Sequence, residues 1–538
     1  MHEGHDGRYV LAYDIGTTGN KTCLYAIDDS IELVDSSLVE YPLYFTEGGG
    51  AEQAADDWWN AVCAGTRLVL EKSGVPAVEI QGISFCCQMQ GSVMVDADGV
   101  ALRNPMGYMD SRAVRQIDEG LHYGLFRIAG CNALRLFNWL RITGGCPATP
   151  KDPVWKYLWV KQNEPEVYAN TYKWLDVKDY LVHRCTGNFC MTPDSANVTF
   201  LYDTRPGRPG WHEGLCKTVG VNMDHLPEVR QSTDMVGGLT EKAASEMGLV
   251  PGTPVFGGGG DVSLISIGAG CLDLYDTNIY VGTSGWVSSC VDTRMVDIQN
   301  FIASIRGAIP SYYNYIAEQE TSGLCLKWVR DHLALDEIGM YLQARHICET
   351  QSGYASLYEY LSSVVNESEP GAGGVIFTPW LQGNRAPRED PYARAMFFNI
   401  GLNTGKRMMI RAVLEGVAYH KRWLLEAVEK RVPRRESVRF VGGGAHSDVW
   451  CQIMADVTGR QIETIENPQN AGALGAAVVI AVGLGLFTSF EKAKAMIPVK
   501  HAYLPRGAYR DVYDRGFSIF KGLYANNRRA FHTLNKSQ

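Results

Sequence analysis

Apolar residues follow two different spacings along this chain, and each spacing predicts a different element. Residues 11–28, LAYDIGTTGNKTCLYAID, hold two short apolar runs joined by a polar turn, which predicts a β-hairpin. Residues 54–74 and 408–432 instead show the spacing of amphipathic helices, and β-rich runs follow at 80–87 and 438–444. Helices that alternate with strands in this way are typical of the α/β class.

The polar turn of the first hairpin has a counterpart in the second half of the chain. DIGTTGNK, from Asp14, is echoed by VGTSGWVSS, from Val281, and the glycines that open the two cores are 266 positions apart, close to half of the chain. This repeat predicts two similar domains that face each other, each with a polar hairpin tip at a shared cleft. No low-complexity linker separates them, so we place the boundary within 268–273, with domains at residues 1–268 and 269–538.

Length, charge and cysteine content narrow the class of protein. The chain of 538 residues is too long for a single core, and its net charge of −9 comes without a run of Lys and Arg. We therefore expect no nucleic-acid partner and no membrane partner. The 14 cysteines are scattered and no apolar leader is visible, which fits reduced thiols in a cytoplasm. We expect Cys86 and Cys87 to be packing residues, and the apolar stretch 471–487 to be a buried helix.

Three glycine-rich segments and one aspartate carry the candidate chemistry. Glycines let backbone N–H groups approach a phosphate or a flat base, so the tips at 16–21 and 282–285 and the segment 442–444 could bind a nucleotide. Neither a Walker A nor a Rossmann spacing is present, and each segment alone is also compatible with an ordinary turn. Asp261 follows four glycines at the end of an apolar strand, where a carboxylate can either project into a cleft or cap the next helix.

These segments belong to a longer series of motifs that resembles a known family. The series reads DIGTTGNK, YMDSRA, WLDVKDYLVHRCTGNF, GGGGD, VGTSG, PWLQGNRAPREDPYARAMFFNI and FVGGGAHSDVWCQIMADVTG. Over about residues 8 to 525 the chain is similar to the FGGY carbohydrate kinases, and among them most similar to the xylulokinases. The resemblance implies two actin-like (ribonuclease-H-like) ATPase domains flanking a central cleft. It also implies phosphorylation of a sugar or polyol with ATP and magnesium.

The resemblance assigns a metal ligand, a catalytic base and a nucleotide site. Asp14 would hold magnesium through water, and Asp261 would accept the proton of the attacking sugar hydroxyl. The residues that would cradle the phosphates are Gly16, Thr17, Thr18 and Lys21 from the first half and Gly282, Thr283 and Ser284 from the second. Those that would hold adenine and ribose are Gly443, Gly444, Ala445, Asp448 and Asn470. Gly444 is expected to approach adenine so closely that valine there would block the base and leave the fold intact.

The same resemblance implies a sugar pocket near the strand end at 88–91. Its residues would be Gln88, Met89, Gln90, Asp110, Arg112 and Asp261. Donors and acceptors of this kind suit an uncharged polyhydroxyl ligand. The match to xylulokinases around residues 88–91 makes D-xylulose, converted to D-xylulose 5-phosphate, the first expected substrate. Xylulokinases usually have His where this chain has Gln90, so another ketose, a polyol or gluconate stays open. Arg112 could instead form an ion pair with Asp110.

Two further expectations concern the second domain and the class of function. Trp380, Arg385 and Asp390 are expected to brace the second domain rather than to touch substrate. An actin-like chaperone or interaction protein would share the nucleotide loops, but it would also need a peptide-binding or assembly module. The two predicted domains leave no residues for such a module. The expected partners are therefore a small sugar and ATP, with a homodimer left open.

Overall fold

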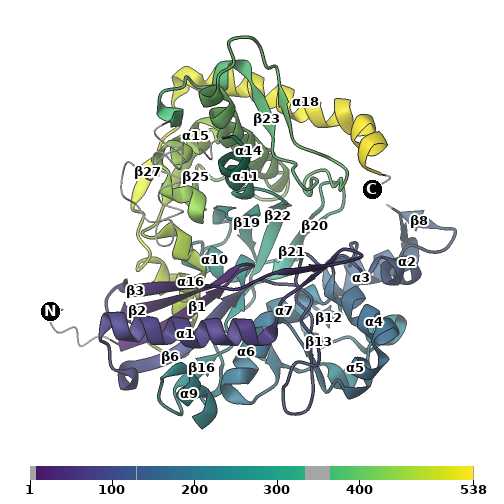
Figure 1. The fold of residues 1–538 in the computed structure, drawn as a ribbon, viewed down its shortest axis with the longest axis vertical. Helices are drawn as coiled ribbons and strands as arrows, with labels where there is room; N and C mark the ends of the chain where they lie inside the picture. Colours follow the sequence, from purple (N-terminus) through teal and green to yellow (C-terminus); the bar gives the residue numbers. More distant parts are fainter. Residues whose placement is uncertain (1–7, 129, 334–363, 537–538) are drawn as a thin grey trace.

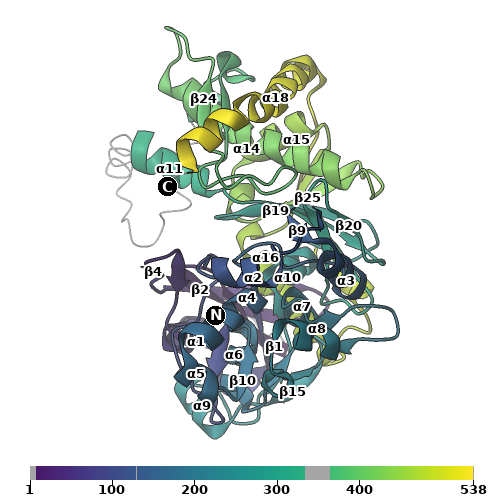
Figure 2. The ribbon, with the colours of Figure 1, turned by 90° about the vertical axis from the view of Figure 1, so that its right-hand side faces the viewer.

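Two β-sheets, one in each half of the chain, organise the fold. The structure is a computed structural model and describes residues 8–128, 130–333 and 364–536. The first sheet uses strands between residues 8 and 260, and the second uses strands between 277 and 503 (Figure 1). In the view of Figure 2 most of the second half lies above the first.

The first sheet contains the predicted N-terminal hairpin. Its strand order is β15-β16-β6-β1-β2-β3, and β17 pairs with β6. The strands β1 and β2 run antiparallel with Asp14 opposite Lys21, whereas β1 and β6 run parallel. The strands are β1 (Arg8–Ile15), β2 (Gly19–Ile27), β3 (Ile31–Glu40), β6 (Ile80–Cys87), β15 (Met235–Gly238), β16 (Pro254–Phe256) and β17 (Gly259–Gly260).

The second sheet repeats this arrangement at its centre. Its order is β20-β21-β22-β19-β18-β25-β26-β27, with β18 and β19 antiparallel and β18 and β25 parallel. A hairpin beside a parallel strand therefore recurs in both halves, as the sequence echo predicts. The strands are β18 (Thr277–Val281), β19 (Gly285–Val291), β20 (Val296–Asp297), β21 (Ile302–Arg306), β22 (Tyr313–Gln319), β25 (Ser437–Val441), β26 (Gln461–Thr464) and β27 (His501–Tyr503).

Helices cover both sheets, and short pairs of strands lie in the segments between them. The helices used below are α1 (Ala55–Ser73), α6 (Val177–Thr186), α9 (Glu241–Met247), α10 (Asp261–Gly268), α11 (Leu324–Leu333), α14 (Lys406–Val428), α15 (Asp448–Thr458), α16 (Ala471–Gly483) and α18 (Arg510–Asn535). The other helices are α2 (Val114–Gly120), α3 (Ala133–Thr143), α4 (Pro153–Asn163), α5 (Pro165–Asn170), α7 (Pro193–Val198), α8 (Glu213–Val219) and α17 (Phe490–Lys494). The short strands are β4 (Tyr44–Thr46), β5 (Gly50–Glu52), β7 (Val93–Val95), β8 (Arg127–Ile128), β9 (Cys131–Asn132), β10 (Lys173–Leu175), β11 (Cys190–Met191), β12 (Tyr202–Asp203), β13 (Gly210–Trp211), β14 (Glu228–Val229), β23 (Ile376–Thr378) and β24 (Met396–Phe398).

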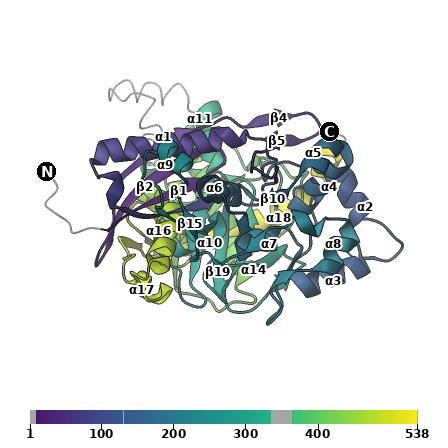
Figure 3. The same ribbon diagram turned by 90° about the horizontal axis from the view of Figure 1, so that it is seen from below.

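Successive residues of the central strands pack on opposite faces of the first sheet, because side chains alternate along a strand. Leu11 lies in the apolar core formed with α1 and α6, and Val10 lies in the core formed with α10 and α16. Figure 3 shows α1 and α16 on opposite sides of β1 and β2. Cys86 and Cys87 divide between the same two cores and are fully buried, so they are packing residues as predicted.

The apolar stretch predicted as a buried helix is α16, and it joins the two halves. It belongs to the second half of the chain but packs on the first sheet and against α10. The crossing with α10 is so close that a methyl group on Gly475 would lie 1.9 Å from the Leu264 carbonyl oxygen, and one on Gly268 would lie 1.8 Å from that of Ala471. Among the residues that the structure describes, no helix is long and apolar enough to cross a membrane.

Candidate active site

The tip of the first hairpin is held by hydrogen bonds to its carbonyl groups. The N–H of Gly16 donates to the Gly19 carbonyl at 3.0 Å, and the Tyr41 hydroxyl donates to the Gly16 carbonyl at 2.6 Å. The Gln53 amide donates to the Thr17 carbonyl at 2.8 Å. Because the carbonyl groups are used inside the protein, the tip can present N–H groups and threonine hydroxyls to an anion.

Asp14 lies beside this tip in a confined position. A methyl group on Gly472, in the first turn of α16, would lie 2.8 Å from its Oδ2. Burial raises the pKa of Asp14, while the Lys21 ammonium and the Cys86 thiol oppose that rise. The Lys21 ammonium itself donates to the Gln469 carbonyl at 2.5 Å, so it connects the first hairpin to the second half of the chain.

The residues around Asp14 suit a hydrated magnesium ion. Within the described ranges, no group of three or more His, Cys, Asp or Glu side chains is arranged to hold a metal directly. Magnesium in nucleotide sites usually keeps several waters and takes one or two carboxylates in addition to phosphate oxygens. One confined carboxylate therefore fits a magnesium ion that arrives with a nucleotide.

Asp261 is the first residue of α10 and lies close to carboxylates from three other elements. Its Oδ1 accepts a hydrogen bond from the N–H of Val262 at 2.8 Å. Burial raises the pKa of Asp261 to about 8, and the carboxylates of Asp14, Glu318 and Asp176 raise it further against that hydrogen bond. The residue at the N-cap position is Gly260, so Asp261 is not the N-cap residue of α10.

The second hairpin tip is also closed by an internal hydrogen bond, but across a turn one residue tighter than in the first. The N–H of Gly282 donates to the Ser284 carbonyl at 3.0 Å. Its other side is tied to the start of α11, because the Thr283 carbonyl accepts from the N–H groups of Ser322 at 3.1 Å and Leu324 at 3.2 Å. Both Gly-Thr tips are thus rigid turns at the ends of central strands.

The third glycine-rich segment begins with a glycine whose positive φ other residues rarely adopt. Gly442 has φ +93, and its N–H donates to the Pro468 carbonyl at 2.9 Å. Asp448 opens α15 and accepts from the Tyr503 hydroxyl at 2.6 Å, while Asn470 is buried at the start of α16. These contacts hold the segment next to the loop that Lys21 reaches.

The expectation for Gly444 needs correction. A side chain at this position would point into the protein, since a methyl group on Gly444 would lie 2.7 Å from Val281 and 2.9 Å from the Trp450 ring. Valine would therefore disturb the packing of β18 against α15, and the substitution cannot test adenine binding with the fold intact.

The predicted sugar residues form a hydrogen-bonded group next to the first tip. The Gln88 amide donates to Gln53 Oε1 at 2.7 Å, and Gln53 also holds the Thr17 carbonyl. Gln90 has φ +64, and its amide donates to Asp152 Oδ1 at 3.2 Å. Burial raises the pKa of Asp152 to about 6. Met89 packs on Gly260, directly before Asp261, where a methyl group would lie 2.3 Å from its sulfur atom.

Asp110 and Arg112 form an ion pair, which was the alternative to sugar binding by Arg112. Arg112 Nη2 lies 2.7 Å from Asp110 Oδ2 and 2.7 Å from Glu52 Oε1, and the guanidinium stacks 4.9 Å from the centre of the Trp159 ring. Asp110 is fully buried and also accepts from the Ala51 N–H at 2.9 Å. A sugar at Arg112 would have to share it with two carboxylates.

Comparison with known proteins identifies the family to which the chain belongs. Family models described as the N-terminal and C-terminal domains of the FGGY family of carbohydrate kinases match residues 9–268 and 277–484. The chain belongs to the FGGY carbohydrate kinases. The motif series and the two-domain α/β fold, predicted from the sequence, are thereby confirmed.

Relatives of this FGGY kinase are named for different substrates. A xylulose kinase of Bacillus subtilis (strain 168) is 28% identical over 527 residues, which is 97% of each chain. A gluconokinase of Bacillus licheniformis is 25% identical over 523 residues, covering 96% of this chain and 95% of that protein. A solved gluconate kinase and a solved xylulose kinase, both from Lactobacillus acidophilus, superpose with a TM-score of 0.82 at 23% identity, over 98% of this chain and all of theirs.

Several charged residues of this FGGY kinase near the site were missed by the sequence analysis. Lys156 is fully buried and donates to the Gln90 carbonyl at 2.8 Å and the Gly107 carbonyl at 2.6 Å. Lys151 of the first half pairs with Glu320 of the second at 2.8 Å. The only signal in the sequence was the charged segment KDPVWK among aromatic residues. The sequence of this segment does not indicate which strand it contacts.

The residues expected to brace the second domain of this FGGY kinase differ in their surroundings. Trp380 is buried against the aromatic side of α18, and Asp390 accepts from the Tyr524 hydroxyl at 3.2 Å. Arg385 instead pairs at 2.6 Å with Glu318, one of the carboxylates near Asp261. Arg385 therefore lies nearer to the candidate chemistry than expected.

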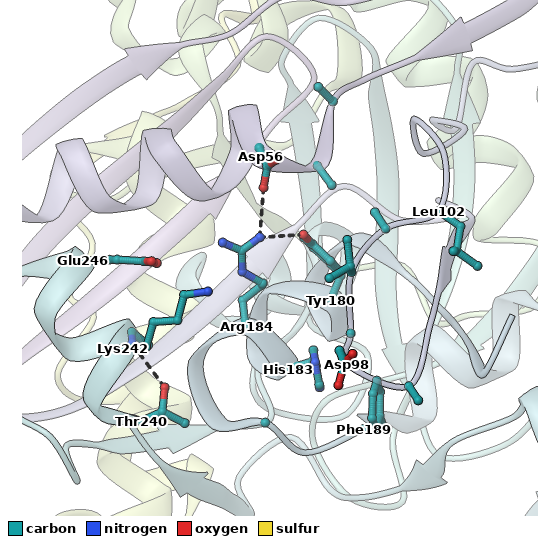
Figure 4. A pocket seen from close by; sticks show the side chains of 18 of the residues that line it. Asp56, Asp98, Leu102, Tyr180, His183, Arg184, Phe189, Thr240, Lys242 and Glu246 are labelled. Atoms are coloured by element: carbon teal, nitrogen blue, oxygen red, sulfur yellow. Dashed lines mark hydrogen bonds and ion pairs between the residues drawn. The ribbon is translucent and has the colours of Figure 1, made fainter. Parts of the chain in front are cut away.

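One cavity of this FGGY kinase lies away from the predicted site residues. It measures about 650 Å³ and is lined by α1, the loop at 97–104, α6 and α9 (Figure 4). The Arg184 guanidinium in it already binds Asp56 at 3.0 Å and the Tyr180 hydroxyl at 2.9 Å. None of the predicted site residues lines this cavity.

Proposed function

We propose that this FGGY kinase transfers the terminal phosphoryl group of ATP to a hydroxyl of an uncharged sugar, with D-xylulose as the first candidate and D-xylulose 5-phosphate as product. The observation that carries the proposal is the strand pairing around β6. Asp14 pairs with Cys86, and Gly260, the residue before Asp261, pairs with Cys87, so the two aspartates lie at the same end of the parallel strands, beside the first Gly-Thr tip. The Glu318 carboxylate of the second half acts on the Asp261 carboxyl group as well. Such a junction can hold a proton acceptor, a metal-bound phosphate and a hydroxyl together.

The proposed mechanism depends on positioning and charge. The two Gly-Thr tips hold the phosphates, and a magnesium ion bound with ATP would neutralise charge on its phosphate oxygens. Asp261 orients the sugar hydroxyl and takes its proton as the oxygen–phosphorus bond forms and the bond to ADP breaks. Phosphoryl transfer has a loose transition state, so Asp261 need not remove the proton in advance.

The charge around the sugar residues favours a neutral substrate. Gln90 donates to the buried carboxylate of Asp152, and Asp261 lies beside Met89. The nearby cations are already engaged, Arg385 by Glu318 and Lys156 by two backbone carbonyls. An aldonate would therefore bring another negative charge to an acidic group, whereas the hydroxyls of a ketose can use the amides of Gln88 and Gln90. This supports a ketose over gluconate, although gluconokinases are among the relatives.

A substrate panel tests the proposal. We expect kcat/KM, from ADP release, to be highest for D-xylulose, lower for other ketopentoses, pentitols and glycerol, and lowest for gluconate, because the latter is repelled by the carboxylates. The Asp261→Asn protein, prepared in the same way, controls for kinases of the expression host. A preference for gluconate would contradict the electrostatic argument. A rate of ADP release that no sugar or polyol changes would contradict the proposed kinase activity.

The raised pKa of Asp261 predicts a pH profile. The free enzyme holds a proton on Asp261 below its pKa of about 8, so the acceptor is blocked there and becomes available as the pH rises. We expect kcat/KM for the sugar to rise from about pH 6 and to level off above the pKa. A profile that is flat or falling over this range would contradict the role of Asp261 as proton acceptor.

A further inference from the structure

One lysine of the second half is fully buried without a hydrogen-bond partner. Lys421 lies on α14 with 0% of its surface exposed, and its Nζ has no partner among the described residues. An unpaired ammonium in the protein interior is costly unless an anion comes close to it. The groups that affect its charge from neighbouring positions are the Cys325 thiol of α11 and the His420 ring, and neither is a carboxylate.

The ammonium of Lys421 lies against the exit of the second Gly-Thr tip. A methyl group on Gly285 would lie 2.4 Å from Lys421 Nζ, 2.5 Å from the Tyr280 carbonyl oxygen and 2.9 Å from Ser322 Oγ. The last glycine of the VGTSG motif therefore leaves the space that the lysine occupies. Ser322 Oγ is a second buried polar atom without a hydrogen-bond partner in the described part of the chain.

The backbone links this buried group to the tip itself. Ser322 donates its N–H to the Thr283 carbonyl at 3.1 Å, so the residue beside Lys421 also holds the turn that we propose for the phosphates. No carboxylate of the described residues acts on this positive charge, so its counter-charge is left to come from the other side of the turn. Nucleotide phosphates at the tip would supply it.

We propose that Lys421 is a positioning residue for the nucleotide, a buried cation behind the 282–285 turn that stabilises the terminal phosphates of ATP across that turn. The proposal rests on the proposed kinase function and on the second tip as a phosphate site. Burial holds the pKa of Lys421 well below its usual range, and phosphates nearby would raise it again. The benefit of the lysine should therefore grow with the number of phosphates.

Lys421→Met tests this with calorimetric binding of ATP, ADP and adenosine in the absence of sugar. Methionine has similar length and no charge. We expect affinity for ATP to fall about tenfold, affinity for ADP to fall less, and affinity for adenosine to stay unchanged. The nucleotide-free variant should unfold at a higher temperature than the wild type, since methionine removes the cost of burying an amine without a hydrogen-bond partner.

Lys327→Met is the matched control, because Lys327 lies on the adjacent α11 but is exposed, where solvent and salt screen its charge. It should leave all three affinities unchanged. If Lys421→Met does not fold, Lys421→Gln carries the same test. Equal losses for ATP and adenosine together with a lower unfolding temperature would show a structural role and overturn the proposal, as would unchanged ATP binding. A wild type that binds no ATP would instead overturn the proposed function itself.

Discussion

Replacing Asp261 by asparagine is expected to lower kcat by a factor on the order of 10² to 10⁴. Asparagine keeps the shape at the start of α10 but cannot accept the proton of the sugar hydroxyl. The loss should appear in kcat, with the binding of sugar and ATP largely retained, and steady-state kinetics with both substrates varied separates the two.

Thermal unfolding gives the same variant an independent readout. The pKa of Asp261 is raised in the folded state, so the stability that its proton provides is lost as the pH rises toward about 8. Asparagine carries no ionisable group, so the variant should gain stability relative to the wild type as the pH increases. A variant that is less stable than the wild type at every pH would indicate that Asp261 mainly supports the helix.

Thr240 offers a control for that structural alternative. It caps α9 in the cavity that no predicted site residue lines, and its hydroxyl accepts from the N–H of Ala243 at 3.2 Å. Thr240→Ala should cost about 0.5 to 2 kcal/mol of stability and leave kcat unchanged. Equal losses of kcat in both variants would contradict a special role for Asp261.

Replacing Asp14 by asparagine is expected to reduce turnover about 10- to 100-fold at a fixed magnesium concentration. The amide keeps the fit against Gly472 but removes the charge that would orient a hydrated magnesium ion. The magnesium concentration needed for half-maximal rate should rise, while adenosine binding stays unchanged. Titration of magnesium at constant ATP measures this directly.

Asp35→Asn is the control for the Asp14 experiment. Asp35 lies on β3 of the same sheet, is partly exposed and accepts from the N–H of Ser36 at 2.6 Å. Removing its charge should leave the magnesium dependence as in the wild type. If Asp14→Asn also behaves like the wild type, Asp14 is not a magnesium ligand.

The elements of the site could be predicted because their signals are local. The tip at 16–21 and its echo at 282–285 carry their turn chemistry in a few consecutive residues, and the helices at 54–74 and 408–432 carry their own periodicity. In the structure these helices are α1 (Ala55–Ser73) and α14 (Lys406–Val428), within a few residues of the prediction. The boundary at 268–273 stays a prediction.

The direction in which side chains point could not be predicted, because it depends on residues far away in the sequence. Gly444 faces Val281 and Trp450, so its lack of a side chain serves packing. Gly285 belongs to the second predicted tip, yet its backbone has no left-handed φ, and its lack of a side chain is explained by Lys421 from a distant helix. The spacing of one segment contains no information about such neighbours.

Charged partners were missed for the same reason. The ion pair between Arg112 and Asp110 could be foreseen because the two residues are close in sequence. Asp152 beside Gln90 and Glu318 beside Asp261 come from other parts of the chain. These carboxylates add negative charge near the proposed sugar site, and this charge is the reason why we propose a neutral sugar as the substrate.

The central claim is that Asp261 and the two Gly-Thr tips direct the terminal phosphoryl group of ATP to a sugar hydroxyl. Phosphorus NMR of the wild-type protein with magnesium, ATP and D-xylulose follows that group directly. We predict that a sugar-phosphate ester forms in step with ADP and that neither forms at a comparable rate without sugar or with Asp261→Asn. ADP together with inorganic phosphate, formed at the same rate with and without sugar, would contradict the claim and indicate an actin-like ATPase without a sugar acceptor.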